Sequence, residues 1–223
     1  MIDCSQLVNK QQTLRQFGKT LVYHGYISND SFALNQEGEL LWISQANSQV
    51  LQKFNGQFEN DRIHGEGQLI FRDEYGGFAE YQGMLQNNQF EGQGTLKLSN
   101  GDIYEGSFQN SLYNGIGKIV FGNQRFTYSG QFINGLFNGE GTLTIVGQMQ
   151  VTSRFQSGLI DITSNAQVQF YNGDSYEGQI NRKYQMHGNG RYQKVLDDGQ
   201  KYVLTGIFLN GKPTQNISKI LIS

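Results

Sequence analysis

The sequence repeats one short phrase eight times, and this periodicity constrains the fold more than any other feature. The phrase is aromatic-x-Gly-x-apolar-x-Asn, with substitutions in some copies, and the copies begin at Tyr23, Phe54, Tyr81, Tyr104, Tyr128, Val151, Tyr176 and Leu204. Successive starts are 23 to 31 residues apart. Such self-similarity is the signature of a repeat architecture, in which each unit buries its apolar face against its neighbours. Because most residues then serve the repeat, the periodicity argues against an enzyme.

The clearest copy, residues 104–127, indicates a β-hairpin. Tyr104, Gly106 and Phe108 are two residues apart and therefore share one face of a strand. Asn110 opens a turn, since asparagine tolerates the left-handed backbone. Gly115 begins a return strand, so the repeat is two antiparallel strands that lead into the next hairpin.

A second motif, Gly-x-Gly, marks the return strand of five copies. It occurs as Gly65/Gly67, Gly92/Gly94, Gly115/Gly117, Gly139/Gly141 and Gly188/Gly190. Glycine weakens a strand unless another group covers the bare backbone. An aromatic ring from the neighbouring strand is the regular solution, so we expect the repeated Tyr and Phe rings to lie on these glycines.

The composition agrees with an all-β fold. Glycine contributes 29 of the 223 residues and aromatic residues 13%, whereas proline occurs once. Disordered chains are poor in aromatic residues, so this chain is expected to fold. Many short strands joined by tight turns suit this composition.

The segments YEGSFQNSLYNGIGKI (104–119) and YSGQFINGLFNGEGTLTI (128–145) resemble MORN repeats, whose pattern is Tyr-Glu-Gly-x-Trp/Phe, Asn-Gly and His-Gly-x-Gly-Thr. The resemblance covers residues 20–212. It is close for the copies that begin at 54, 81, 104, 128 and 176, and degenerate for those at 23, 151 and 204. It implies a single-layer twisted antiparallel sheet of about eight stacked hairpins, a solenoid-like rod with a groove.

The two ends lie outside the repeats. Asp3 to Phe17 is predicted to be a short amphipathic helix with Leu7, Leu14 and Phe17 on one side. Asp3 and Gln6 resemble a capping box at its start. The expected organisation is an N-terminal helix in 1–19, a MORN-repeat domain in 20–212 and a tail in 213–223. The apolar residues 217–222 of the tail can form a final strand.

Two surfaces are candidates for binding. The first is a groove lined by the repeated rings, for which the expected partner-binding residues are Tyr81, Tyr104, Tyr128, Tyr176, Phe108 and Phe132. The alternative is that these rings only stack on glycines and hold the repeats together. The second is a basic C-terminal end, represented by Arg182, Lys183, Arg191 and Lys194.

The charge is distributed unevenly along the chain. Residues 20–110 contain four Lys/Arg and twelve Asp/Glu, whereas residues 180–223 contain seven Lys/Arg and two Asp. The basic end suits an acidic protein surface or acidic phospholipid, and the two ends suit head-to-tail association. The pI of about 5.9 argues against nucleic acid, whose binding domains are typically basic.

Catalytic, cofactor and metal sites are not expected. A dinucleotide fingerprint needs a third glycine before a helix, and a P-loop needs Gly-Lys-Ser/Thr. His64 and His187 each precede a Gly-x-Gly pair, where the MORN pattern has histidine, and Cys4 is the only cysteine. The sequence contains no apolar run long enough for a membrane-spanning helix. It also leaves no room for a catalytic domain beside the repeats.

These observations predict a non-enzymatic structural scaffold that holds other proteins of a large assembly. The resemblance implies a cytoplasmic, cytoskeletal location, and specifically the axoneme of cilia or flagella, because MORN proteins occur in radial spokes. Homo- or hetero-oligomers with other MORN proteins are also implied. The alternative is a membrane-associated adaptor that binds acidic phospholipid through the basic C-terminal end.

Overall fold

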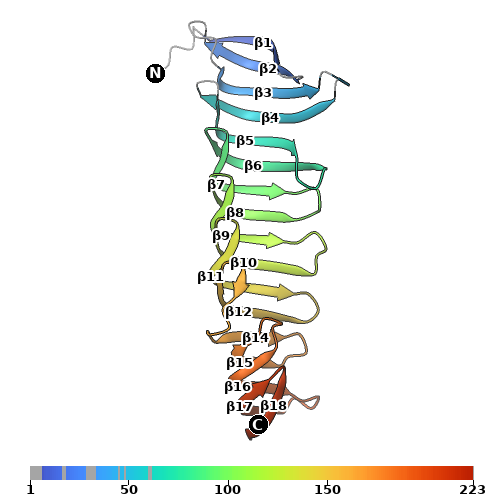
Figure 1. Cartoon of the computed structure of the whole chain (residues 1–223), viewed down its shortest axis with the longest axis vertical. Helices are drawn as coiled ribbons and strands as arrows, with labels where there is room; N and C mark the ends of the chain where they lie inside the picture. Colours follow the sequence, from blue (N-terminus) through green and yellow to red (C-terminus); the bar gives the residue numbers. More distant parts are fainter. Residues whose placement is uncertain are drawn as a thin grey trace. The chain divides into compact units, whose positions relative to one another are not determined.

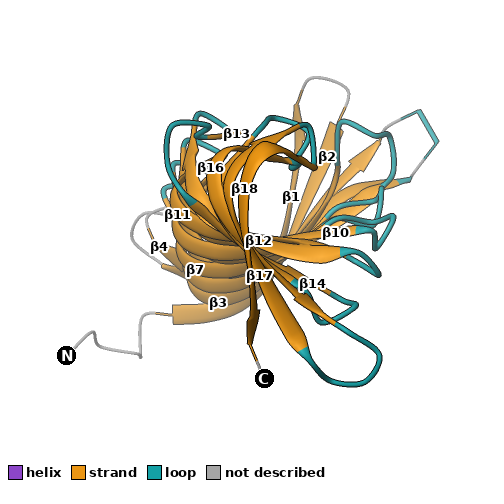
Figure 2. Cartoon of the chain, turned by 90° about the horizontal axis from the view of Figure 1, so that it is seen from below, coloured by secondary structure: helices purple, strands orange, loops and turns teal. Residues whose placement is uncertain are grey.

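The structure is a computed structural model that describes residues 7–16, 19–28, 34–44, 46–47, 49–59 and 62–222. The chain divides into two compact units, Met1–Asn114 and Gly115–Ser223, and each is described by itself. All described elements are strands, turns and loops (Figure 2). None of the described residues forms a helix that is long and apolar enough to cross a membrane.

The first unit is an antiparallel sheet in which each strand pairs with the next strand along the chain (Figure 1). Its strands are β1 (Leu7–Gln16), β2 (Lys19–Ser28), β3 (Leu34–Ser44), β4 (Val50–Glu59), β5 (Arg62–Arg72), β6 (Phe78–Gln86), β7 (Gln89–Lys97) and β8 (Ile103–Gln109). The division between the units falls within β9 (Leu112–Val120).

The second unit continues the same pattern with one irregularity. It contains the rest of β9, then β10 (Phe126–Ile133), β11 (Leu136–Ile145), β12 (Met149–Gln156), β13 (Leu159–Ile160), β14 (Ala166–Phe170), β15 (Ser175–Ile180), β16 (Met186–Val195), β17 (Lys201–Leu209) and β18 (Lys212–Ile222). Here β12 pairs with the two-residue β13 and also with β14, so one return strand is broken in two.

Two-residue turns close the hairpins. Both central residues have positive φ in the turns at Asn87/Asn88, Asn110/Ser111, Asn134/Gly135, Ser157/Gly158 and Asn210/Gly211. This geometry matches the right-handed twist of the strands it joins, and it favours Asn and Gly. The prediction that Asn110 opens a turn is confirmed.

Glycines face one another across successive strands and form a continuous row. In the first unit the row consists of Gly25, Gly38, Gly56, Gly67, Gly83, Gly94 and Gly106. A β-bulge follows the row in most hairpins, for example between Gly83 and Leu85. Bulges bend the strand that carries them. The glycine row is therefore the line along which the sheet of this unit bends.

The predicted all-β fold of stacked antiparallel hairpins is confirmed, but the predicted N-terminal helix is wrong. Residues Leu7–Gln16 form strand β1, which pairs with β2 along its whole length, from Leu7 opposite Ser28 to Gln16 opposite Lys19. A short isolated helix is marginal in water, whereas pairing with β2 satisfies a full ladder of backbone groups. The expected capping box at Asp3 and Gln6 lies outside the described residues.

Gly94→Ala tests the requirement for bare backbone in the row. A Cβ at Gly94 would lie 2.5 Å from the Tyr81 hydroxyl oxygen and 2.7 Å from its ring carbons. We expect a loss of about 2–3 kcal/mol in the free energy of unfolding because the Tyr81 ring is overpacked. The measurement is the urea-unfolding midpoint.

Gly76→Ala is the matched control. A Cβ at Gly76 meets nothing within 4 Å, although its φ of +83° is strained for alanine. That backbone strain costs about 1 kcal/mol. A Gly94→Ala protein as stable as the Gly76→Ala protein would contradict the steric explanation.

Candidate functional site

The six rings proposed as a binding groove are core residues. Tyr81, Tyr104, Tyr128, Tyr176, Phe108 and Phe132 each expose between 0% and 3% of their surface. A side chain with so little exposed surface has none to offer a partner. The prediction of an open groove lined by these rings is therefore wrong. The alternative, stacking on glycine, describes Tyr81, Tyr128 and Tyr176. Phe108 and Phe132 instead pack edge-on against neighbouring tyrosine rings.

Each of the four tyrosines is held at both ends of its ring. The ring lies against the glycine row, as the ring of Tyr81 lies on Gly83 and Gly94. The hydroxyl donates a hydrogen bond to a backbone carbonyl three residues later: Tyr81 to Met84 at 2.7 Å, Tyr104 to Ser107 at 2.8 Å, Tyr128 to Gln131 at 3.1 Å and Tyr176 to Gln179 at 2.7 Å. Burial raises the pKa of all four to about 12, so they remain neutral hydrogen-bond donors.

A second row of rings covers these tyrosines from the return strands. The ring centroids are 3.7 Å apart for Tyr81 and Phe90, 3.8 Å for Tyr104 and Tyr113, and 3.8 Å for Tyr128 and Phe137, each nearly parallel. Phe90, Tyr113 and Phe137 are half-buried. Sequence reasoning missed this row, although its rings stand two residues before three of the five Gly-x-Gly pairs.

The face opposite the rings carries a polar hollow in the first unit. Its volume is about 960 Å³, and its floor is the backbone of the glycine row. The polar residues that line it are Glu37, Glu39, Asn55, Glu66, Gln68, Gln82, Gln93, Thr95 and Glu105. We call this surface the polar trough. It was not predicted from the sequence.

Cross-strand register aligns one wall of the polar trough. Glu39 faces Asn55, Asn55 faces Gln68, Gln68 faces Gln82, Gln82 faces Thr95, and Thr95 faces Glu105. The wall therefore runs across six strands, β3 to β8. With strands ~4.8 Å apart, its length is about 24 Å.

Five of the repeats begin at an aromatic residue and were identified above as close copies of the phrase. A family model matches each of these five repeats separately. The model for the MORN repeat matches residues 54–74, 81–103, 104–124, 128–147 and 176–195. The chain is a MORN-repeat protein. The five matches begin at the five positions identified above as close copies. Repeats of this family are known as protein and membrane interaction modules. No curated protein matches the chain.

The MORN repeats of the second unit present a different polar face. The row that corresponds to the wall of the polar trough is Lys118, Ser129, Thr142, Thr152, Gln167, Glu177, Arg191 and Thr205. Two smaller hollows of about 280 and 390 Å³ lie along it, and Glu177 and Arg191 line both. This row is thus mainly hydroxyl and amide, and its charged residues are Lys118, Glu177 and Arg191.

The four residues of the proposed basic end are dispersed. Arg182 and Lys183 are exposed neighbours in the turn between β15 and β16. Arg191 lies on the polar face opposite Glu177. Lys194 is half-buried and close enough to Asp174 to lower the pKa of that carboxyl group. They do not form one basic patch.

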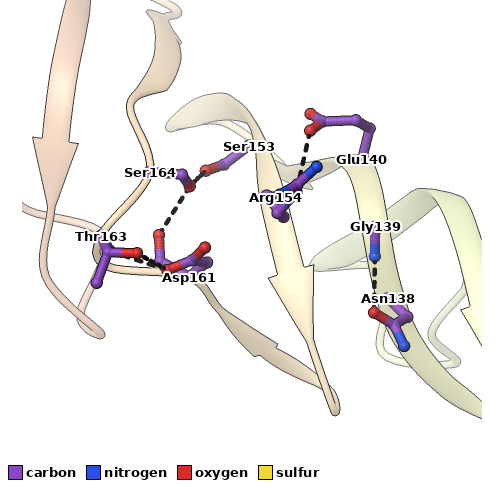
Figure 3. A network of polar contacts seen from close by, with 8 residues as sticks. All are labelled: Asn138, Gly139, Glu140, Ser153, Arg154, Asp161, Thr163 and Ser164. Atoms are coloured by element: carbon purple, nitrogen blue, oxygen red, sulfur yellow. Dashed lines mark hydrogen bonds and ion pairs between the residues drawn. The ribbon is translucent and has the colours of Figure 1, made fainter.

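The degenerate repeat at Val151 replaces ring stacking with a polar network (Figure 3). Ser153 occupies the glycine position, exposes 3% of its surface and lies 3.3 Å from the Ser164 hydroxyl. Ser164 donates to the carbonyl of Asp161 at 2.9 Å. Hydrogen bonds from the hydroxyl and N–H of Thr163 lower the pKa of Asp161. This network orders the broken return strand, where Val151 is too small to cover the backbone as tyrosine does.

The repeat at Tyr176 has a buried carboxylate at its start. Asp174, 3% exposed, accepts hydrogen bonds from the Tyr192 hydroxyl, from the Val195 N–H at 2.9 Å and from the Asn172 amide at 2.8 Å. Burial alone would raise the pKa of Asp174, but these donors and nearby Lys194 outweigh it and lower the pKa. The carboxylate ties the turn before β15 to strand β16.

The described residues contain no group of three or more His, Cys, Asp or Glu side chains that could hold a metal ion. His64 lies 3.6 Å from Glu59, and the buried Nδ1 of His187 has no hydrogen-bond partner among the described residues.

Tyr104→Phe separates a core role from a binding role. Because the hydroxyl donates to the Ser107 carbonyl inside the fold, we expect its removal to lower the free energy of unfolding by about 1 kcal/mol. Partner binding should not change. The exposed Tyr171 provides the control, since Tyr171→Phe should change stability by less than about 0.5 kcal/mol. Unchanged stability of Tyr104→Phe would contradict the assignment.

Asp174→Asn should reduce the free energy of unfolding at neutral pH. It should also make that free energy fall less steeply as the pH is lowered into the acid range. Because the folded pKa is lowered, the unfolded chain takes up this proton first as the pH falls. The stabilisation is complete above the ordinary carboxyl value of 3.8 and is lost as the pH falls through the folded pKa. We expect a loss of about 2 kcal/mol at neutral pH from charge-assisted hydrogen bonds.

Urea unfolding over a series of pH values measures this effect. Asp197→Asn is the control, because Asp197 is exposed. Parallel stability curves for Asp174→Asn and the unsubstituted protein would contradict a lowered pKa.

Proposed function

We propose that this chain is a non-enzymatic scaffold whose MORN repeats hold other proteins together in a cytoskeletal assembly. The observation that carries the proposal is the polar trough, which is an open surface that contributes nothing to the ring core. Its length is about 24 Å, with strands ~4.8 Å apart. Extended repeat surfaces of this kind suit elongated partners. Family membership supports the same conclusion, since MORN repeats act as interaction modules.

The proposed location is cytoplasmic and cytoskeletal, in the axoneme of cilia or flagella. Resemblance to MORN proteins of radial spokes motivates this part of the proposal. The partners are then other proteins of the assembly, including other MORN proteins. We expect neither an enzyme activity of the chain itself nor binding to nucleic acid.

Native affinity purification of the tagged full-length chain at low ionic strength, followed by mass spectrometry, tests the scaffold. We expect recovery with axonemal or other cytoskeletal proteins, and the tag alone is the control. Fluorescence of the tagged chain along the cilium tests the location in the same cells. Recovery without any cytoskeletal protein would contradict the proposal.

The membrane adaptor is tested on the same preparation by co-sedimentation with liposomes, with and without anionic lipid. We expect no sedimentation, because the basic side chains at 182–194 are dispersed and lipid binding typically needs four to eight clustered Lys/Arg. Sedimentation with anionic lipid that is lost on neutralising Arg182, Lys183, Arg191 and Lys194 would favour the adaptor.

A further inference from the structure

The polar trough has an excess of negative charge at defined places. Four carboxylates line it, Glu37, Glu39, Glu66 and Glu105, and no Lys or Arg belongs to its lining among the residues that the structure describes. Lys53 forms an ion pair with Glu39. The other three are exposed and form no ion pair within the described part of the chain. The described lining of the trough therefore carries a net negative charge, contributed mainly by Glu37, Glu66 and Glu105.

The carboxylates are spread along both walls rather than gathered at one point. Glu39 and Glu105 lie on the same wall at opposite ends, on β3 and β8, whereas Glu37 and Glu66 lie across the glycine row on β3 and β5. A small cation is held by ligands that converge within a few ångströms. This arrangement instead suits an elongated ligand with several positive groups.

The rest of the lining fits a peptide backbone. Asn55, Gln82, Gln93 and Thr95 supply amide and hydroxyl groups that both donate and accept hydrogen bonds. The floor is backbone, so an extended chain can approach closely without meeting side chains. A segment of about seven residues spans about 24 Å at ~3.3 Å per residue.

We propose that the polar trough of the first unit binds an extended, Lys/Arg-rich segment of a partner protein. The segment lies along the glycine row, its basic side chains reach Glu37, Glu66 and Glu105, and its backbone bonds to the amide side chains. The inference rests on the proposed scaffold function and names the chemistry of its partner.

A second copy of this chain fits the trough less well. Three basic residues of its C-terminal end lie against other groups of the same chain: Arg191 faces Glu177, Lys194 lies by Asp174, and the Lys219 ammonium sits 4.2 Å from the centre of the Tyr202 ring. Charge complementarity along the whole trough therefore favours a flexible segment over the folded end of another copy.

Fluorescence polarisation with a labelled peptide tests the proposal. The probe alternates lysine and serine over about nine residues, enough to span the trough, and the matching glutamate–serine peptide is the probe control. The variant Glu66→Gln/Glu105→Gln removes two trough carboxylates. The matched variant Glu59→Gln/Glu74→Gln removes two exposed carboxylates of the same unit outside the trough. All four residues are exposed, so both variants should unfold at the same urea midpoint as the unsubstituted chain.

We expect saturable binding of the lysine peptide that weakens with salt, as exposed charge pairs do. The trough variant should weaken it about 2- to 30-fold, the range for two exposed ion pairs, and the matched variant by less than about 2-fold. Equal weakening of peptide binding by both variants would overturn the proposal, because it would show a general electrostatic attraction rather than a site. The absence of peptide binding to the unsubstituted chain would also overturn it.

Sedimentation analysis of the chain tests the other possible occupant of the trough, a second copy of this chain. A salt-sensitive dimer that Glu66→Gln/Glu105→Gln dissociates would assign the trough to a second copy and overturn the partner segment. Native purification of the same variant then distinguishes a failure of the trough assignment from a failure of the proposed scaffold function. If this variant retains the cytoskeletal partners that the unsubstituted chain recovers, the trough does not hold them, so the trough assignment fails and the scaffold stands.

Discussion

The contact between an aromatic ring and bare glycine backbone is the interaction on which each unit depends. A single hairpin is not stable in water, and here the ring of one strand covers the glycines of its own strand and of the next. Tyr81 lies on both Gly83 and Gly94, so the contact joins the two strands of the hairpin. The same contact fixes register: a slip of one residue would turn the rings to the other face and place side chains where the rings require glycine.

Much of this fold follows from the sequence because its determinants are local. The two-residue alternation of Tyr104, Gly106 and Phe108 defines one face of a strand, and Asn followed by Asn, Ser or Gly defines the turn. The N-terminal segment was misassigned because Leu7, Leu14 and Phe17 allow a helical stripe as well as a strand. What decides in favour of β1 is the open edge of β2, a partner that no local pattern reveals.

The candidate site was misplaced for a related reason. The sequence groups Tyr81, Tyr104 and Phe108 on one face, but it does not say whether that face is covered. The cover comes from Phe90 and Tyr113 on the return strands, which stack on the tyrosines at 3.7 and 3.8 Å. The polar trough is harder still to predict, because Glu39 and Glu105 belong to one wall only through five successive strand pairings.

The core and the surface of these repeats therefore obey different constraints. On the ring face the side chains are limited by contact. Even the degenerate repeat replaces the missing ring contact: Ser153 stands at the glycine position, and its hydroxyl lies 3.3 Å from that of Ser164. On the polar face no packing partner limits the side chain, so charge can differ between repeats of the same fold. The wall from Glu39 to Glu105 is acidic at both ends, whereas the row from Lys118 to Thr205 balances Glu177 against Arg191. Because the core is common to the repeats and this face is not, whatever distinguishes one MORN surface from another in binding must be encoded in the polar rows. These rows include positions of the repeat motif itself: Glu105 is the Glu of Tyr-Glu-Gly, and Gln82 replaces that Glu in the copy that begins at Tyr81.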